Sequence, residues 1–179
     1  MQAIREALEE KYGCGAVPAG EIRPTMKAPV LLPSADGPTA ELLFWGFRMP
    51  KSLVINARAE TAAEKPLFRE SVRSMRCVIP SSGFYEWDAE KRKYLFTLPG
   101  KAELYMAGLY AIRDDILCFC ILTTAANESM RDVHDRMPLI LTREQISPWL
   151  SKPGVADEIL QSIPPQLEKM PLEPQMSLW

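Results

Sequence analysis

Apolar residues recur four positions apart at the start of the chain and predict an amphipathic helix. Within Gln2–Tyr12, Ile4 and Leu8 hold this spacing among charged residues, which places both on one helix face. No residue with a capping side chain precedes this stretch, so the sequence is expected to begin inside an element. A loop rich in Gly and Pro follows at residues 13–20.

A second helix is predicted further along the chain from the same kind of spacing. Phe68, Val72 and Met75 lie four and three apart, as on the buried face of a helix. Pro66 falls in the expected first turn, where a missing backbone N–H is least damaging. We therefore expect a helix over Ala62–Met75.

Most of the remaining chain is predicted to be β-structure. Continuous apolar runs bounded by Pro, Gly and Asp turns are typical of buried strands. Strands are expected at residues 42–47, 53–55, 77–79, 84–87, 94–98, 104–110, 116–123 and 138–141. Pro24 and Pro29 limit residues 22–32 to short or edge-type extended pieces. Because turns join the later strands, we expect an antiparallel meander.

The C-terminal part is predicted to combine short helices with an extended tail. Thr142 and Gln145 form a capping box that opens a helix. Short helices, or in the first case a loop, are also expected at residues 127–133 and 155–161. Repeated prolines then favour an extended path for residues 163–179, with Leu178 and Trp179 as anchors on the surface.

Length and composition indicate one globular domain, residues 1–179. Hydrophobic residues make up 47% and charged residues 25%, which excludes disordered, collagen-like and coiled-coil classes. The longest apolar runs, such as Ile116–Leu122, are far too short for a bilayer, and the first residues carry charges where a signal peptide would be apolar. We expect a cytoplasmic, monomeric protein without a membrane partner.

Charge is distributed unevenly along the chain. The formal net charge of −2 excludes a protein that coats DNA through overall basicity. Residues 48–76 nevertheless carry seven basic and three acidic side chains. Arg69, Arg73 and Arg76 recur at spacings of four and three, a stripe able to meet phosphates if that face lines a groove. Charge alone favours the alternative, a solvated helix face.

The cysteines do not indicate a metal site. Cys14, Cys77, Cys118 and Cys120 include no CxxC pair, and His134 is the only histidine. We expect reduced thiols and no zinc. Cys118 and Cys120 lie two apart in an apolar run, so they should share one buried strand face.

Polar residues follow a predicted buried strand and form the first candidate site. Asn56, Arg58 and Glu60 alternate along an extended segment, which places the three side chains on one side. Such a row needs polar partners. The pattern fits a solvent-facing strand edge at least as well as a binding site.

Two further stretches hold candidate proton-transfer groups. Glu86 lies among the aromatic residues of Gly83–Trp87, and desolvation there should raise its pKa toward neutrality. A surface carboxylate beside core aromatics is the alternative. His134 is flanked by Asp135 and Arg136 and precedes a strand, so it is expected at an element end, where functional groups are often presented.

Six motifs, taken in order, resemble the SOS response-associated peptidase family. They are Trp45-Gly46, Asn56–Thr61, Arg76–Pro80, Gly83–Trp87, Ala107–Leu109 and His134–Pro138. The likeness runs from Ile22 to Leu150, and several motifs in order are far more specific than one. Residues 175–179 are also similar to the family's tail. The resemblance implies a β-rich α+β fold in which antiparallel or mixed sheets form a barrel-like core with flanking helices and a central groove.

The resemblance implies a function in DNA damage and the SOS response. The groove would bind single-stranded DNA that contains an abasic site and join to it covalently. In the family, a cysteine directly after the initiator Met captures the ring-opened sugar as a thiazolidine, which is a lyase-like step. The same constellation removes the residue ahead of that cysteine, hence the labels hydrolase and protease. No cofactor or metal is implied.

The resemblance also implies residue roles. Asn56 would hold the cysteine and the sugar, Glu86 would shuttle protons, and His134 would assist ring opening and reversal. An N-terminal α-amine suits imine formation because its reference pKa of about 7.7–8.0 leaves it partly neutral. Contacts to DNA would come from Arg58, Arg136, Trp45 and Thr123.

The sequence departs from the family at the nucleophile. Position 2 is Gln2, and the family's opening Met-Cys-Gly-Arg and first strand, about twenty residues, have no counterpart here. Either the chain starts too late, or it is a variant that binds DNA without the full crosslink. Two alternatives are a non-catalytic single-strand DNA sensor using Trp45 and the arginines, and a thiol peptidase pairing Cys77 with His134.

Overall fold

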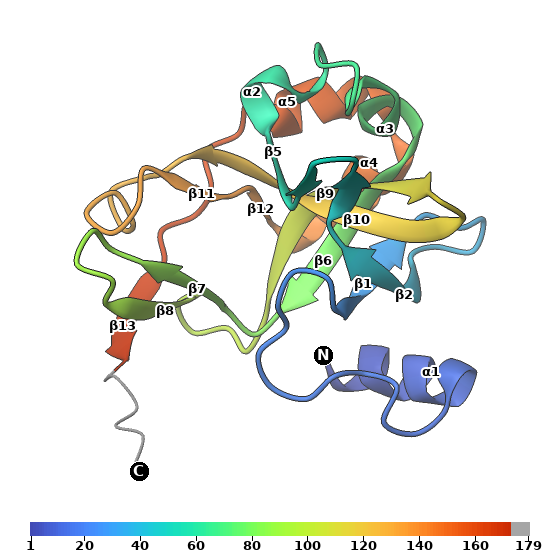
Figure 1. The fold of residues 1–179 in the computed structure, drawn as a ribbon, viewed down its shortest axis with the longest axis horizontal. Helices are drawn as coiled ribbons and strands as arrows, with labels where there is room; N and C mark the ends of the chain where they lie inside the picture. Colours follow the sequence, from blue (N-terminus) through green and yellow to red (C-terminus); the bar gives the residue numbers. More distant parts are fainter. Residues whose placement is uncertain (173–179) are drawn as a thin grey trace.

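A closed β-barrel forms the centre of the chain in the computed structural model, which describes residues 1–172 (Figure 1). Its strands are β1 (Lys27–Leu32), β2 (Thr39–Trp45), β6 (Arg76–Ser81), β9 (Leu104–Arg113) and β10 (Ile116–Ala125). They follow the order β10-β2-β1-β6-β9, and β9 pairs with β10 to close the ring. The expected β-rich α+β architecture with a barrel-like core is confirmed.

Strand β10 pairs with four other strands of this sheet. Its first half lies parallel to β2, with Cys118 opposite Phe44. Its second half lies between β5 (Asn56–Arg58), which runs parallel to it, and β11 (Arg136–Pro138), which runs antiparallel. Strand β12 (Ile140–Leu141) pairs with β9. The sheet is therefore mixed, because β10 pairs in parallel with β2 and β5. Among the strands from β6 onward all pairings are antiparallel, as expected, but β6 pairs with β9 and not with the next strand along the chain, so these strands do not form one continuous meander.

The expectation of an edge strand around Pro29 is also wrong, because β1 lies between β2 and β6. The structure shows how the proline is tolerated. Pro29 pairs with Leu42 of β2, whereas the β1–β6 register places only Leu31 opposite Val78. The pairing of β1 with β6 therefore does not extend to Pro29, which limits the hydrogen bonds that its missing N–H can remove.

A smaller sheet lies beside the barrel and carries the end of the described chain. Strands β7 (Phe84–Trp87), β8 (Lys93–Thr97) and β13 (Glu168–Leu172) pair antiparallel in the order β13-β8-β7. Residues 163–172 therefore end in a paired strand instead of only crossing the surface. The proposed anchors Leu178 and Trp179 lie outside the described residues. A separate hairpin consists of β3 (Phe47–Met49) and β4 (Ser52–Val54).

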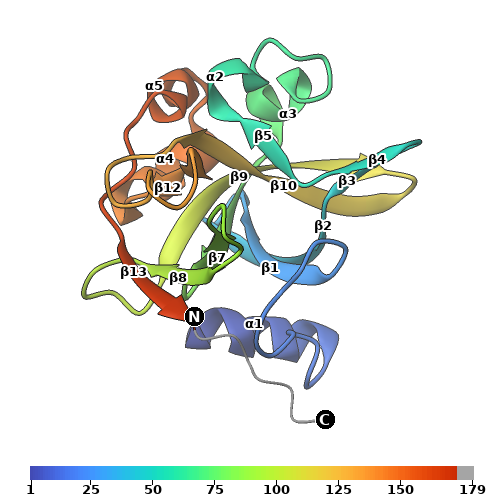
Figure 2. The same ribbon diagram turned by 60° about the vertical axis from the view of Figure 1, so that its left-hand side comes forward.

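Helices cover two sides of the barrel (Figure 2). The helix α1 (Gln2–Tyr12) packs on β1 and β2. The others are α2 (Ala59–Ala62), α3 (Arg69–Ser74), α4 (Arg143–Ser151), the 3-10 helix η1 (Pro153–Val155) and α5 (Ala156–Leu160). The capping box at the start of α4 is confirmed by both of its hydrogen bonds. None of the helices in residues 1–172 has the length and apolarity needed to cross a bilayer.

The helix predicted over residues 62–75 is interrupted. Helix α2 ends at Ala62, and α3 begins only at Arg69. Turns occupy the residues between them, with the Lys65 N–H bonded to Thr61 and the Phe68 N–H bonded to Lys65. Pro66 lies in this gap. The prediction placed Pro66 in the first turn of one long helix. In the structure Pro66 lies in the loop between α2 and α3, and α3 is shorter than the predicted helix.

Arg76 corrects the predicted basic stripe. Only 3% of the residue is exposed, and its guanidinium donates to the backbone carbonyls of Trp149, Val72 and Arg73. It therefore joins α3 and α4 to the barrel and cannot meet a phosphate. Burial lowers the pKa of its guanidinium.

Alternate residues along the barrel strands belong to two apolar clusters. On β10, Cys118 and Cys120 belong to one cluster, whereas Phe119 and Ile121 belong to the other. The predicted shared, buried face of the two cysteines is thus confirmed. The clusters meet closely at Gly108, where an added Cβ would lie 2.4 Å from the Cδ1 of Ile79. Only glycine fits there without moving the core.

Candidate functional site

One large cavity opens between the barrel and the sheet that carries β7. Its volume is about 1290 Å³, and its walls come from α1, the loop at residues 17–24, and strands β5, β7, β10 and β11. All seven residues singled out from the sequence line it. They are Asn56, Glu86, His134, Arg58, Arg136, Trp45 and Thr123. The structure therefore brings together residues from five separate stretches of the chain.

Strand β5 places the side chains of Asn56 and Arg58 on the same side of the strand, because successive side chains point in opposite directions. Both are exposed, while Ala57 between them is buried in the core. Parallel pairing with β10 sets Asn56 opposite Ile121 and Arg58 opposite Thr123. Both polar side chains thus line the cavity. Within the described residues Arg58 makes no ion pair, and its guanidinium is open to an incoming anion.

Arg136, by contrast, is held in a bidentate ion pair. Its Nη1 and Nη2 each donate to one carboxylate oxygen of Glu60 at 2.8 Å. Nη2 also donates to the Thr123 carbonyl at 2.6 Å, and Thr124 donates its hydroxyl to Glu60. These contacts lower the pKa of Glu60 to about 2, with the hydrogen bonds from Arg136 as the main cause. The guanidinium of Arg136, which lines the cavity, is therefore held in a fixed plane by Glu60.

The imidazole of His134 is oriented by the chain next to it. Its Nδ1 accepts the backbone N–H of Arg136 at 3.0 Å. The same Nδ1 lies 3.1 Å from the Arg136 carbonyl oxygen and 3.4 Å from the Asp135 carboxylate, so the tautomer decides whether Nδ1 accepts or donates. The Arg136 backbone thus holds the orientation of the imidazole at the cavity.

Glu86 is presented by β7, which lies unusually close to β8. At Gly83 a Cβ would come within 2.6 Å of the Phe96 carbonyl oxygen, so glycine lets the two backbones approach. Burial raises the pKa of Glu86, while the nearby His134 and a hydrogen bond from the Trp87 backbone oppose the rise. This is the direction that the aromatic surroundings predict. The raised pKa makes the carboxyl group a better proton donor than an exposed glutamate.

Two aromatic features complete the walls. Trp45 stacks on Phe119 with centroids 6.2 Å apart, and its indole N–H donates to the Ile55 carbonyl. Lys93 lies 3.8 Å from the centroid of Tyr85 and 5.3 Å from that of Trp87. These are cation–π distances.

Sequence reasoning missed three residues of the site. Glu60 was noted in a polar row but not as the partner of Arg136, which lies 76 positions further along. Glu21 accepts a hydrogen bond from Lys93 at 2.7 Å and ties the loop before β1 to β8. Lys93 lies opposite Trp87 in the β7–β8 hairpin. The expected pairing of these two neighbouring strands was the one signal by which sequence reasoning could have placed Lys93 at the site.

Cys77 does not form a thiol site with His134. The residue is fully buried in β6, and burial raises the pKa of its thiol well above the ordinary value. A reactive thiolate needs access and a nearby positive charge. The thiol peptidase alternative therefore finds no support. Among residues 1–172, no three or more His, Cys, Asp or Glu side chains cluster as metal ligands would.

Comparisons with known proteins give a family match over nearly the whole chain. The family model described as SOS response associated peptidase (SRAP) matches residues 2–177. Abasic site processing protein YobE of Bacillus subtilis (strain 168) is 38% identical over 169 residues, which cover 82% of this chain and 77% of YobE.

Solved structures show the same fold. A phage-related protein from Bordetella bronchiseptica is similar with a TM-score of 0.75 and 26% identity, covering 96% of this chain and 91% of that protein. A protein from Bacteroides thetaiotaomicron has a TM-score of 0.71 and 27% identity, with 83% and 75% covered.

Proposed function

This chain belongs to the SOS response associated peptidase family, and from that membership we propose that it processes abasic sites in DNA. The observation that carries the proposal is the cavity itself. Asn56, Glu86 and His134 come from β5, β7 and the segment before β11, yet they line one open space of about 1290 Å³. That volume accommodates a nucleotide-sized group.

The three polar side chains fit the chemistry of a ring-opened sugar. An abasic sugar exposes an aldehyde only after its ring opens, and ring opening needs proton transfer at two oxygens. The His134 imidazole offers a nitrogen for proton transfer, and burial raises the pKa of Glu86, which makes its carboxyl group a better proton donor than an exposed glutamate. The Asn56 amide both donates and accepts, so it orients the sugar hydroxyls.

The arginines have different roles in this proposal. Arg58, exposed beside the cavity, takes the phosphate next to the lesion. Both terminal nitrogens of the Arg136 guanidinium already donate to Glu60. Arg136 therefore contributes to DNA binding through the fixed orientation of its guanidinium and through its remaining N–H. Trp45 and Thr123 shape the wall that the DNA strand follows.

The covalent step is proposed for a chain that carries a cysteine directly after the initiator Met. Hydrolysis of the Met–Cys peptide bond first frees the α-amine of the cysteine, and this amine then adds to the sugar aldehyde and loses water to form an imine. The thiol then adds to the imine carbon, its proton passes to nitrogen, and a thiazolidine ring closes. Position 2 here is Gln2, which has no thiol. The chain as given should therefore bind the lesion without forming the thiazolidine.

The test compares this chain with a version that carries an added N-terminal Met-Cys-Gly-Arg segment. Both are incubated with single-stranded DNA that contains one abasic site and with undamaged DNA of the same sequence. We expect a heat-stable crosslink from the extended version only, reduced at least about tenfold by Glu86→Gln, a loss typical for a proton-transfer group. Equal crosslinking by both chains would show that the nucleophile is misassigned.

A binding assay separates the remaining alternative. If the chain binds single strands with steep salt dependence but without preference for an abasic site, it is a non-catalytic single-strand sensor. Preference for an abasic analogue that is lost in Asn56→Ala supports the proposed site.

A further inference from the structure

A row of exposed cations lies outside the cavity, on the segment that follows β5. Lys65, Arg69 and Arg73 are spaced four apart and all are exposed. The Arg69 N–H bonds to the Lys65 carbonyl at 2.9 Å, so a single helical turn from Lys65 leads into α3 and places the three side chains near one face. Phe68 and Val72 point to the opposite face and are buried in the core.

These cations lack acidic partners in the part of the chain that the structure describes. Some exposed cations elsewhere are paired, as Lys11 is with Glu41 and Lys169 with Asp132, whereas others, such as Lys51 and Lys91, are unpaired within residues 1–172. Glu64 and Glu70 lie in the same segment, but neither forms an ion pair with the row in the described residues, and Glu60 of α2 is taken by Arg136. With these two acids counted, the segment from Glu64 to Arg73 keeps a small positive excess of three cations over two carboxylates in a protein whose formal net charge is −2.

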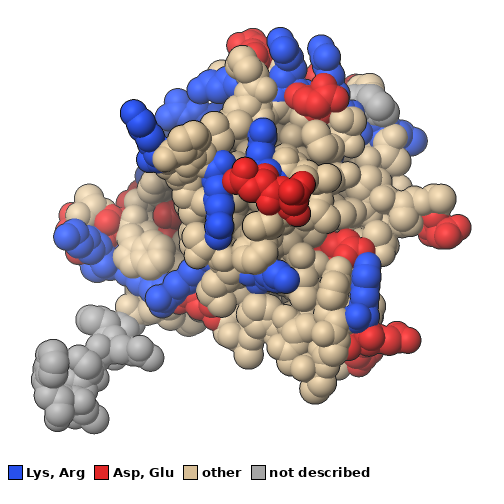
Figure 3. All heavy atoms as spheres, turned by 45° about the vertical axis from the view of Figure 1, so that its right-hand side comes forward, with Lys and Arg blue, Asp and Glu red and all other residues tan. Residues whose placement is uncertain are grey.

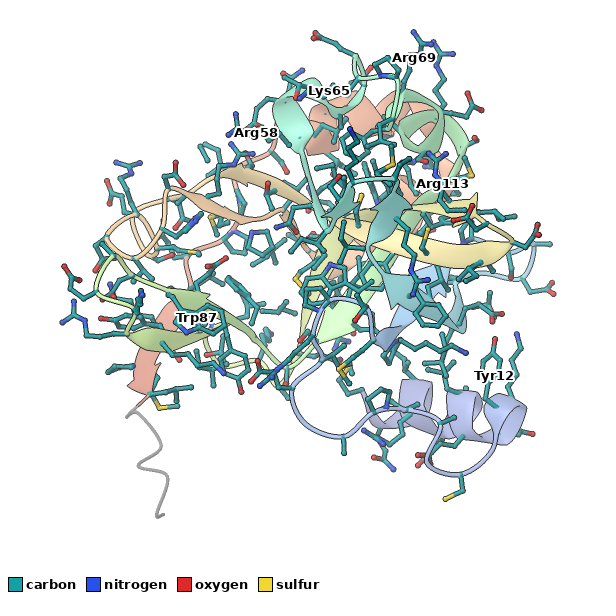
Figure 4. The ribbon with its side chains drawn as sticks, in the orientation of Figure 1. Tyr12, Arg58, Lys65, Arg69, Trp87 and Arg113 are labelled. Atoms are coloured by element: carbon teal, nitrogen blue, oxygen red, sulfur yellow. The ribbon has the colours of Figure 1, made fainter. Side chains whose placement is uncertain are left out.

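The row continues from the cavity. Arg58 lines the cavity and directly precedes α2, and the Lys65 N–H bonds to Thr61 within the turn that follows α2. Figure 4 shows Arg58, Lys65 and Arg69 in sequence along the upper margin of the molecule. Figure 3 shows Lys and Arg side chains gathered along the upper part of the face it presents.

We propose that Lys65, Arg69 and Arg73 bind the phosphate backbone of a single DNA strand after it leaves the cavity past Arg58. The inference rests on the proposed function and extends its binding surface beyond the lesion. Residues four apart on a helix are separated by about 6 Å along the axis, so the row offers regularly spaced charges to a polyanion. Long, flexible side chains reach successive phosphates without reading bases.

The test is a triple variant, Lys65→Gln, Arg69→Gln and Arg73→Gln. Its matched control changes three exposed lysines that do not line the cavity, Lys91→Gln, Lys101→Gln and Lys152→Gln. Binding is measured over a range of salt concentrations with abasic-analogue single strands of about 4 and about 16 nucleotides, the range of common single-strand site sizes.

For the long strand, the triple variant should bind at least about tenfold more weakly at low salt, and its salt slope should fall by about 2, since each lost phosphate contact contributes about 0.7. The short strand, which fills only the cavity, should bind as before, and the control should match the unchanged protein.

An equal loss for both lengths, or an equal loss in the control, would overturn the surface while leaving the proposed function intact. If the unchanged protein binds neither strand, the proposed function and this surface are both refuted.

Discussion

Replacing Glu60 by Gln should destabilise the fold by about 1 kcal/mol at neutral pH. The pKa of Glu60 falls from 4.5 to about 2 in the folded protein. At 1.36 kcal/mol for each pKa unit, that shift corresponds to at most about 3 kcal/mol. The carboxylate side chain is 44% exposed, however, so solvent screening reduces the contribution to about 1 kcal/mol. The amide of Gln keeps one acceptor for Arg136 but carries no charge.

The loss has a defined pH dependence. Because the folded pKa lies below the unfolded one, the charged carboxylate stabilises the fold fully above about pH 5, and this contribution disappears as the pH falls from 4.5 toward 2. Urea denaturation of the unchanged protein and of Glu60→Gln should therefore differ at neutral pH and converge near the lower end of that interval.

Glu64→Gln is the matched control, because Glu64 is exposed in the same segment and makes no ion pair within residues 1–172. It should leave the midpoint unchanged. A difference between Glu60→Gln and the unchanged protein that stays constant over the whole pH range would refute the reasoning, and so would an equal loss in the control.

Three further predictions follow from single contacts. Gly83→Ala places a Cβ 2.6 Å from the Phe96 carbonyl oxygen, so we expect a loss of about 1–3 kcal/mol in urea denaturation and weaker crosslinking through the displaced Glu86. Arg76→Met removes a buried donor from three carbonyls and should destabilise the protein by about 2–4 kcal/mol, measured in the same way, without changing the salt slope of DNA binding. Asn127→Ala breaks the amide contacts to the carbonyls of residues 164 and 165 and should accelerate hydrogen exchange in β13.

Local patterns predicted the local structure well. The capping box at Thr142 opens α4, and the apolar run through Cys118 and Cys120 forms a buried strand. Both depend on residues within a few positions of one another. The interrupted helix shows the limit of the same reasoning, because Pro66 fits a first helical turn and a loop equally well, and tertiary packing selected the loop.

Non-local pairing was beyond the reach of the pattern. The parallel alignment of β5 on β10 places Arg58 beside Thr123, and nothing in either stretch specifies that partner. Arg76 looked like a member of a surface stripe because its burial depends on α4, which begins 67 positions later. For the site, the family resemblance supplied the set of residues, and the structure supplied the ion pair that distinguishes Arg136 from Arg58.

The position of β13 has a consequence for biosynthesis. This last described strand is the outer member of the sheet whose other edge, β7, holds Glu86, and a two-stranded hairpin alone is only marginally stable in water. Translation proceeds from the N-terminus, so the barrel strands emerge from the ribosome well before the residues that brace β8. A nascent chain can therefore complete its barrel before β13 is available to brace the wall that carries Glu86.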